Sequence, residues 1–280
     1  MSASAPTHPA SLTEQEARER AALLEIQRYD IAVDLTGLLE GDTVESVSTI
    51  TFACTSPGST TFVDCVADVR HATLNGCELD LSTVTDGRIP LPDLAPDNVL
   101  VVASAQSDTA SSAGILRTVD PSDKLVYVWM SFEADDARRI WACFDQPDLK
   151  APHAFTVTAP ESWTVTSNGA PDSVAPAGDA ARVWTFPDTP SLSTYVVVIN
   201  AGPFHELRRE VGGQARGEQV FWLDEVRVTR IGPDLAHGIP FGARRSDRSH
   251  PSHAERKWHF RTRLSSEHAR VGQSEPRASQ

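Results

Sequence analysis

Basic residues are scarce in this chain of 280 residues, which has 25 Lys and Arg against 38 Asp and Glu and a formal net charge of −13. This balance argues against a nucleic-acid partner for the protein as a whole. The charge is unevenly distributed, because residues 1–240 hold 16 basic and 34 acidic side chains while residues 241–280 hold nine and four. An acidic segment of −18 therefore precedes a basic tail of +5.

Long apolar runs are also missing. No stretch of 18 apolar residues occurs, and the N-terminus has no charged region followed by an apolar one. The sequence therefore predicts neither a membrane span nor a signal peptide, and we expect a cytoplasmic protein without a membrane partner.

Cysteines at C-x-x-C spacing are absent as well. The chain has four cysteines, each alone in an apolar or mixed stretch, namely Cys54, Cys65, Cys77 and Cys143. Isolated cysteines of this kind favour buried, reduced thiols over disulfides or a zinc site.

A short helix is predicted near the N-terminus, over residues 11–26. Thr13 followed by Glu16 has the spacing of a capping box. Small and apolar residues at helical spacing indicate an amphipathic helix, and these are Ala17, Ala21, Leu23 and Leu24.

Alternating apolar and polar residues dominate the chain from residue 29 to about residue 205. Such alternation is typical of half-buried strands, and Asn75-Gly76 between two runs is the clearest hairpin turn. The predicted strands begin with the run of Tyr29, Ile31, Val33 and Leu35, and continue with 44–53, 59–66, 68–76, 98–105, 124–132, 153–160, 163–169, 181–186 and 193–202. We predict a mainly β fold, as a large antiparallel β-sandwich or saddle-like sheet.

The pattern fails after about residue 210. Neither strand nor helix spacing is sustained there, and from Phe241 onward the aliphatic residues other than alanine are Leu264 and Val271. A segment this polar cannot offset its conformational entropy by burial, so a disordered C-terminal tail is expected. Its Arg, Ser, His, Pro, Gly and Ala content suggests a frameshifted or truncated coding sequence over 215–280. The expected organisation is a flexible N-terminus (1–10), a β-domain (11–210) and this tail (211–280).

Histidines of the C-terminal part give little sign of a metal site. His205-Glu206 begins a partial H-E-x-x-H match, but its second ligand position is Arg209, which stays protonated and cannot bind zinc. The tail histidines have no recognised ligand spacing, and the tail's limited aromatic content disfavours a nucleic-acid arm. These histidines are His250, His253, His259 and His268.

Unusual residues are densest in the segment 129–152, WMSFEADDARRIWACFDQPDLKAP. Taken alone, Asp135 and Asp136 beside Arg138 and Arg139 indicate a salt-bridged turn. The apolar members of the segment are expected in the core, and these are Trp141, Cys143 and Phe144.

The same segment resembles the amino-terminal β-domain of zinc aminopeptidases of the aminopeptidase N type. The family reads approximately Q-F-E-x-x-D-A-R-R-x-F-x-C-F-D-x-P-D-x-K-A, and this chain reads S-F-E-A-D-D-A-R-R-I-W-A-C-F-D-Q-P-D-L-K-A. RYDIAVDL and STYVVVINAGPFHELR are similar to the actinobacterial branch. The resemblance extends from about Leu12 to Glu210 and implies the large β-domain with a short N-terminal helix.

Two substrate-binding residues follow from the resemblance. Glu133 matches the family acid that helps hold the free α-amine of a substrate peptide, so the implied partner is a peptide N-terminus. Ser131 stands where the family has a glutamine that lines the first side-chain pocket. Serine is shorter and has no amide, so a weaker pocket contact is expected. Asp145, Pro147 and Asp148 match positions that we interpret as structural turn residues.

The family's catalytic motifs, H-E-x-x-H and G-x-M-E-N, do not occur in the 280 residues, whose methionines are Met1 and Met130. The resemblance therefore implies a chain truncated before the catalytic domain. The intact family uses zinc, but we expect no cofactor in this chain and no activity from it alone. Two alternatives remain open. One is a non-catalytic β-sandwich binding module, and the other is half of a split peptidase with a separate catalytic domain as its partner.

Overall fold

The computed structural model describes residues 11–107, 113–178, 180–211, 214–223, 225–231, 243–244 and 259–260. The chain divides into two compact units, Met1–Gly238 and Ile239–Gln280. In the second unit, β18 (Ala243–Arg244) pairs antiparallel with β19 (His259–Phe260). The predicted flexible segment 1–10 and most of the predicted disordered tail lie outside the described residues.

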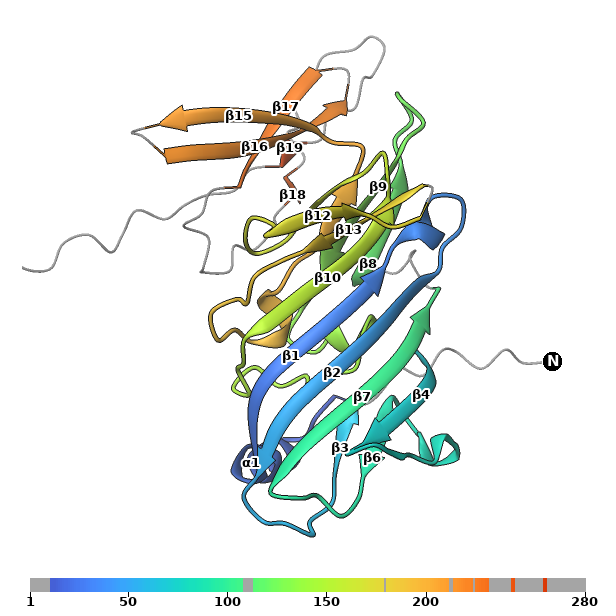
Figure 1. The fold of residues 1–280 in the computed structure, drawn as a ribbon, viewed down its shortest axis with the longest axis vertical. Coiled ribbons are helices and arrows are strands. Elements are labelled where there is room, and N and C mark those ends of the chain that lie inside the picture. The colour runs from blue at the N-terminus through green and yellow to red at the C-terminus, as the bar shows by residue number, and fades with distance from the viewer. Residues whose placement is uncertain are drawn as a thin grey trace, which may run out of the picture. The chain divides into compact units, whose positions relative to one another are not determined.

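A long sheet dominates the first unit, and its strands cross most of Figure 1. Its described order is β12-β13-β10-β1-β2-β7-β4-β5. The strands are β1 (Leu24–Asp34), β2 (Val44–Cys54), β4 (Asp68–Leu74), β5 (Cys77–Glu78), β7 (Asp97–Gln106), β10 (His153–Pro160), β12 (Ser173–Pro176) and β13 (Ala181–Thr185).

One pair in this sheet departs from the antiparallel sheet expected from the sequence. β1 and β10 run parallel, with Tyr29 opposite His153 and Val33 opposite Val157. Parallel neighbours need a long connection, and here it is made by all the strands between β1 and β10. The other paired strands of the described sheet are antiparallel.

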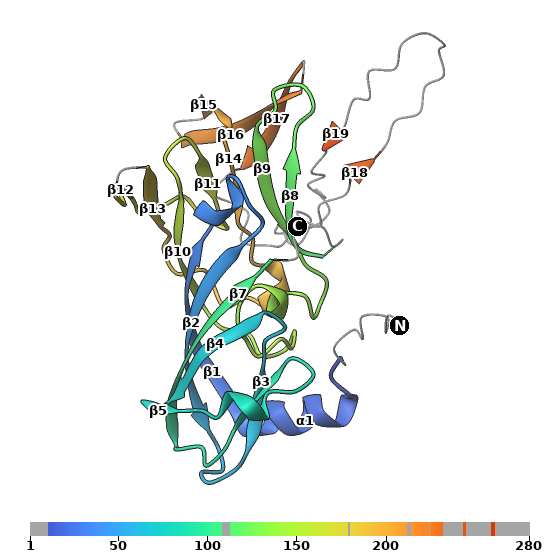
Figure 2. The same ribbon diagram turned by 90° about the vertical axis from the view of Figure 1, so that its right-hand side faces the viewer.

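Smaller elements lie on one side of the long sheet in Figure 2, where α1, β3 and the β8–β9 hairpin appear to the right of β1, β2 and β7. A second sheet has the order β11-β14-β9-β8, and a short ladder joins β3 to β6. Their bounds are β3 (Thr61–Asp64), β6 (Arg88–Leu91), β8 (Gly114–Val119), β9 (Val126–Ser131), β11 (Thr164–Thr166) and β14 (Asn200–Gly202). The 3-10 turns are η1 (Thr36–Leu38), η2 (Leu81–Thr83), η3 (Ala137–Arg139) and η4 (Thr194–Val196).

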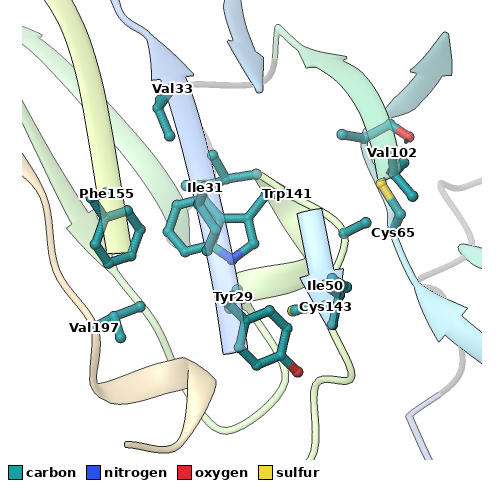
Figure 3. Close-up of a cluster of buried hydrophobic side chains, with 14 of the residues drawn as sticks. Tyr29, Ile31, Val33, Ile50, Cys65, Val102, Trp141, Cys143, Phe155 and Val197 are labelled. Carbon is teal, nitrogen blue, oxygen red and sulfur yellow. Dashed lines mark hydrogen bonds between the residues drawn. The ribbon is translucent and has the colours of Figure 1, made fainter. Parts of the chain in front are cut away.

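The core fills the space between the sheets, and its alternation confirms the strand pattern. Every second side chain of β2 is buried. Trp141 is fully buried and stacks edge-on against Phe155, with ring centroids 5.5 Å apart, and Ile31 of β1 lies beside it in Figure 3. The Asn75-Gly76 hairpin is also confirmed, because both residues have positive φ, as a type I′ turn requires.

The N-terminal helix differs from its prediction. α1 covers Glu14–Leu23, and its capping box between Thr13 and Glu16 is present. However, Leu24 already belongs to β1 and Ala21 is exposed, while the helix residue that is buried is Arg20. The helix packs on the domain through the ion pair of Arg20 with Asp64 rather than through an apolar face. Within the described ranges, no helix has the length and apolarity needed to cross a bilayer.

Two further predictions need correction. The strand predicted over 193–202 is the turn η4 followed by the short β14, because the hydroxyls of Ser193 and Thr194 donate to the Pro147 carbonyl and to Asp145. Cys77 is exposed at the β4–β5 hairpin, whereas the other three cysteines are buried, and all four are free.

Backbone beyond residue 210 is more regular than the sequence pattern suggested. β15 (His205–Val211), β16 (Gln214–Leu223) and β17 (Glu225–Ile231) form an antiparallel sheet. Their ladders are made by backbone groups, which every residue type except proline supplies.

Candidate functional site

The two predicted substrate-binding residues lie at the end of β9. Ser131 is the last residue of the strand and pairs with Gly114 of β8, while Glu133 follows two residues later. Both side chains are exposed. No hydrogen bond or ion pair from another described residue reaches the Glu133 carboxylate, which is therefore available to a ligand.

The backbone of Glu133, in contrast, is held from two directions. Its N–H donates to Oδ2 of Asp136 at 2.9 Å, and its carbonyl accepts from the Asp136 N–H at 3.4 Å. Asp136 is 6% exposed. The result is a tight turn that presents an exposed acid from a fixed backbone.

Arg139 ties this turn to the neighbouring strand. Its Nε donates to Oδ1 of Asp136 at 2.7 Å. A Cβ placed on Gly114, whose φ is +94°, would meet the Cβ of Arg139 at 3.4 Å. The positive φ favours glycine at this position, which pairs with Ser131 across the β8–β9 ladder.

The base of the turn is fixed by Arg138 and Asp145. The Arg138 side chain donates to the carbonyl and the carboxylate of Asp135 at 2.8 and 2.9 Å, and its backbone N–H donates to Oδ2 of Asp145 at 3.0 Å. Oδ1 of Asp145 accepts from the Thr194 hydroxyl at 2.5 Å. The predicted salt-bridged turn is confirmed, and Asp145 has the structural surroundings expected for it.

A buried ionic cluster continues from Asp145 to helix α1. The Asp145 N–H donates to Oδ2 of Asp64 at 3.1 Å, and the same oxygen accepts from Nη1 of Arg20 at 2.7 Å. Gln146 accepts from Nε of Arg20 and donates to the Ala17 carbonyl. We call Arg20, Asp64, Asp145 and Gln146 the Arg20 cluster; it connects the helix to the turn that carries Glu133.

Burial shifts two titrating groups of this region in opposite directions. Removal from water raises the pKa of Asp145 to about 7, although hydrogen bonds from Thr194 and Arg138 act against the shift. Burial lowers the pKa of His153 to about 4, and its ring stacks on Tyr29 at 4.6 Å between centroids. Both groups lie inside the domain rather than at its surface.

The described part of the chain does not fit a zinc ion. Among the described residues, no three His, Cys, Asp or Glu side chains come together as a metal-binding group. His205 and Arg209 lie on β15, where residues four apart are separated by about 13 Å rather than by one helical turn. His259 lies in β19, and the other tail histidines are outside the described residues.

The sequence predicts Glu133 and Ser131 as site residues but does not predict what supports Glu133. The role of Asp136 as acceptor for the Glu133 amide was not predicted, although an Asp three residues after the acid is a signal for a turn. Arg139 and Gly114 are neighbours in space but 25 residues apart in sequence, so no local pattern could indicate their proximity.

Comparison with known proteins places this segment in a family. Residues 104–196 match the model described as the Peptidase M1 N-terminal domain, and they include both predicted site residues. The chain is 45% identical over 201 residues to an aminopeptidase N of Streptomyces lividans, covering 70% of this chain and 23% of that protein. The chain carries the N-terminal domain of the M1 aminopeptidases, which we call the M1 domain.

More distant relatives match over a similar length of the chain. The chain is 27% identical over 192 residues to a leucyl aminopeptidase of Saccharolobus solfataricus and 25% identical over 189 residues to a probable aminopeptidase 1 of Sulfurisphaera tokodaii. Each match covers 67% of this chain and 23% of the relative. The chain thus spans about a quarter of the length of these curated relatives.

Proposed function

We propose that the M1 domain of this chain anchors peptide substrates of a zinc-dependent aminopeptidase through the carboxylate of Glu133. The observation that carries the proposal is the contrast at Glu133: the buried carboxylate of Asp136 holds the backbone N–H, while the Glu133 carboxylate is exposed and unengaged by the described residues. An anionic group on a fixed backbone suits a peptide α-ammonium. Charge-assisted hydrogen bonds to it would select a free N-terminus over a blocked one.

The zinc ion and the activation of water are proposed to come from a part of the enzyme other than the described residues. The chain alone is therefore expected to release no product from leucine p-nitroanilide with added zinc. Metal-dependent turnover by the purified 280-residue chain would contradict this part of the proposal.

A chimera tests the anchoring role directly. Residues 12–210 of this chain would replace the matching segment of the Streptomyces lividans aminopeptidase N, and kcat/KM would be measured for leucine p-nitroanilide. Hydrogen bonds to charged groups contribute about 1.5–3 kcal/mol, so Glu133→Gln should lower kcat/KM by roughly 10- to 150-fold. Glu45→Gln, which removes the same charge from an exposed position of β2, is the control. Equal values for the two variants would reject the proposal.

Ser131 is proposed to line the pocket for the first side chain of the substrate. Its position at the end of β9, two residues before Glu133, supports this. In the same chimera, the quantity to compare is the ratio of kcat/KM for leucine p-nitroanilide to kcat/KM for alanine p-nitroanilide. Ser131→Gln should change this ratio relative to the unsubstituted chimera, and by more than Glu45→Gln does. An unchanged ratio would count against the pocket role.

A further inference from the structure

The turn after β9 uses one carboxylate for two purposes. Oδ2 of Asp136 accepts the Glu133 N–H, and Oδ1 of the same group accepts Nε of Arg139. The Asp136 side chain is 8% exposed, and that of Arg139 is 22% exposed. The carboxylate is therefore held by a cation while it holds the peptide group of Glu133.

The neighbouring acid makes a different set of contacts. Asp135 accepts from Arg138 and from the Ser11 hydroxyl, and its side chain is 38% exposed. Neither bond reaches the backbone of Glu133. Asp135 and Asp136 thus offer a matched pair: they are adjacent and of the same residue type, and each is paired with an arginine three residues later.

We propose that Asp136 is the positioning residue of Glu133: its buried carboxylate, braced by Arg139, fixes the peptide group from which the substrate-binding acid projects. The inference rests on the proposed function of Glu133 and adds the group that aims it. Arg139 lies near Gly114, the β8 residue that pairs with Ser131, so the brace is close to both predicted substrate-binding residues.

The two donors face different oxygens of Asp136, so in this geometry both atoms must be acceptors. An asparagine of the same shape has one acceptor and one donor, so its NH2 would face either the Glu133 N–H or the Arg139 Nε–H. Asp136→Asn therefore keeps the volume of the side chain while removing one of the two bonds and the charge that Arg139 pairs with.

Amide hydrogen exchange of the full 280-residue chain, followed residue by residue by NMR, tests the brace. In Asp136→Asn the Glu133 amide should exchange at least tenfold faster than in wild type, while core amides of β1 and β2 stay unchanged. Asp135→Asn should leave the Glu133 amide within about twofold of wild type. No acceleration at Glu133, or the same acceleration across β1 and β2, would overturn the proposal.

Binding of leucinamide, which has a free α-amine, tests whether Asp136 affects substrate binding. N-acetyl-leucinamide, whose α-amine is blocked, is the control ligand. Leucinamide should shift the Glu133 signals of the wild-type chain, the blocked compound should not, and Asp136→Asn should weaken the apparent affinity at least threefold. Binding that Asp136→Asn leaves unchanged would overturn the positioning role. An absence of leucinamide binding to the wild type would instead contradict the function proposed for Glu133, while the exchange rates would still decide whether Asp136 holds the turn.

A second variant covers the case in which Asp136→Asn does not fold. Arg139→Gln leaves the Glu133–Asp136 bond in place but removes the cation that braces the carboxylate. It should accelerate exchange of the Glu133 amide about threefold, and an unchanged rate would overturn the proposal.

Discussion

Arg20 is the residue whose loss should destabilise the M1 domain most clearly. Its guanidinium, on a helix of ten residues, is 2% exposed and pairs with an equally buried Asp64 at 2.7 Å. It also lies over the rings of Phe62 and Phe144, at 5.1 and 5.7 Å from their centroids. Replacement by alanine would leave the Asp64 carboxylate buried without its cation.

The magnitude follows from that stranded charge. Removal of one partner of a buried ion pair costs about 3–5 kcal/mol. A domain of this kind is stabilised by about 5–15 kcal/mol, so Arg20→Ala should remove a large part of its free energy of unfolding. Arg18 in the same helix provides the comparison, because its pair with Glu14 is 79% exposed on both sides. Exposed pairs contribute about 0–1 kcal/mol, which is the loss expected for Arg18→Ala.

Urea unfolding followed by tryptophan fluorescence measures both variants on the same scale. A double variant, Arg20→Met with Asp64→Asn, removes both charges and keeps an acceptor for the Asp145 N–H. It should recover at least about 1 kcal/mol relative to Arg20→Ala, since the stranded charge is gone. Equal losses in the free energy of unfolding for Arg20→Ala and Arg18→Ala would show that the buried Arg20–Asp64 pair does not hold the helix.

Two other properties can be checked on the same chain. Burial raises the folded-state pKa of Asp145 from its ordinary 3.8 to about 7, so the contribution of Asp145 to stability falls as pH rises from about 4 to 7. Burial lowers the pKa of His153 from 6.5 to about 4, so the contribution of His153 to stability rises with pH between those two values. Asp145→Asn should therefore show urea midpoints that rise from pH 4.5 to 6.5 and stay level above it, and a midpoint that still falls towards pH 7 would contradict the assignment. In the native chain one thiol, that of exposed Cys77, should react rapidly with Ellman's reagent, and the other three only after unfolding, because they are buried and burial raises the pKa of Cys65 to about 12. More than one fast thiol would be inconsistent with the fold.

Strands with one buried face could be predicted from the sequence, because alternation is a local property. β2, β7 and β10 were predicted within one or two residues. Strands with weaker alternation were missed, as for β12, whose four side chains are all exposed, and for β8, whose last two residues are exposed. Nothing in such a stretch distinguishes a strand from a loop until its partner is known.

The candidate site was predictable only in part, for a related reason. Glu133 could be proposed as a site residue because it belongs to a distinctive motif. The brace around it depends on the bonds that the Asp136 carboxylate accepts from the Glu133 N–H and from Arg139, which follow from the folded backbone and not from the residue types alone. Arg20 shows the same limit, since its partner Asp64 is 44 residues away and a cation on a short helix is usually exposed.

The parallel pairing of β1 with β10 has a consequence for folding during translation. The edge of β1 that β10 covers belongs to residues 29–34, and its partners, residues 153–158, are translated about 120 codons later. At about 5–20 residues per second, a ribosome needs roughly 6–24 seconds to supply them. During that time β1 can pair with β2 but keeps an open edge, which is the kind of surface that recruits other unfinished chains. Chaperone capture of nascent chains should therefore be strongest before residue 160 is synthesised and decline after it.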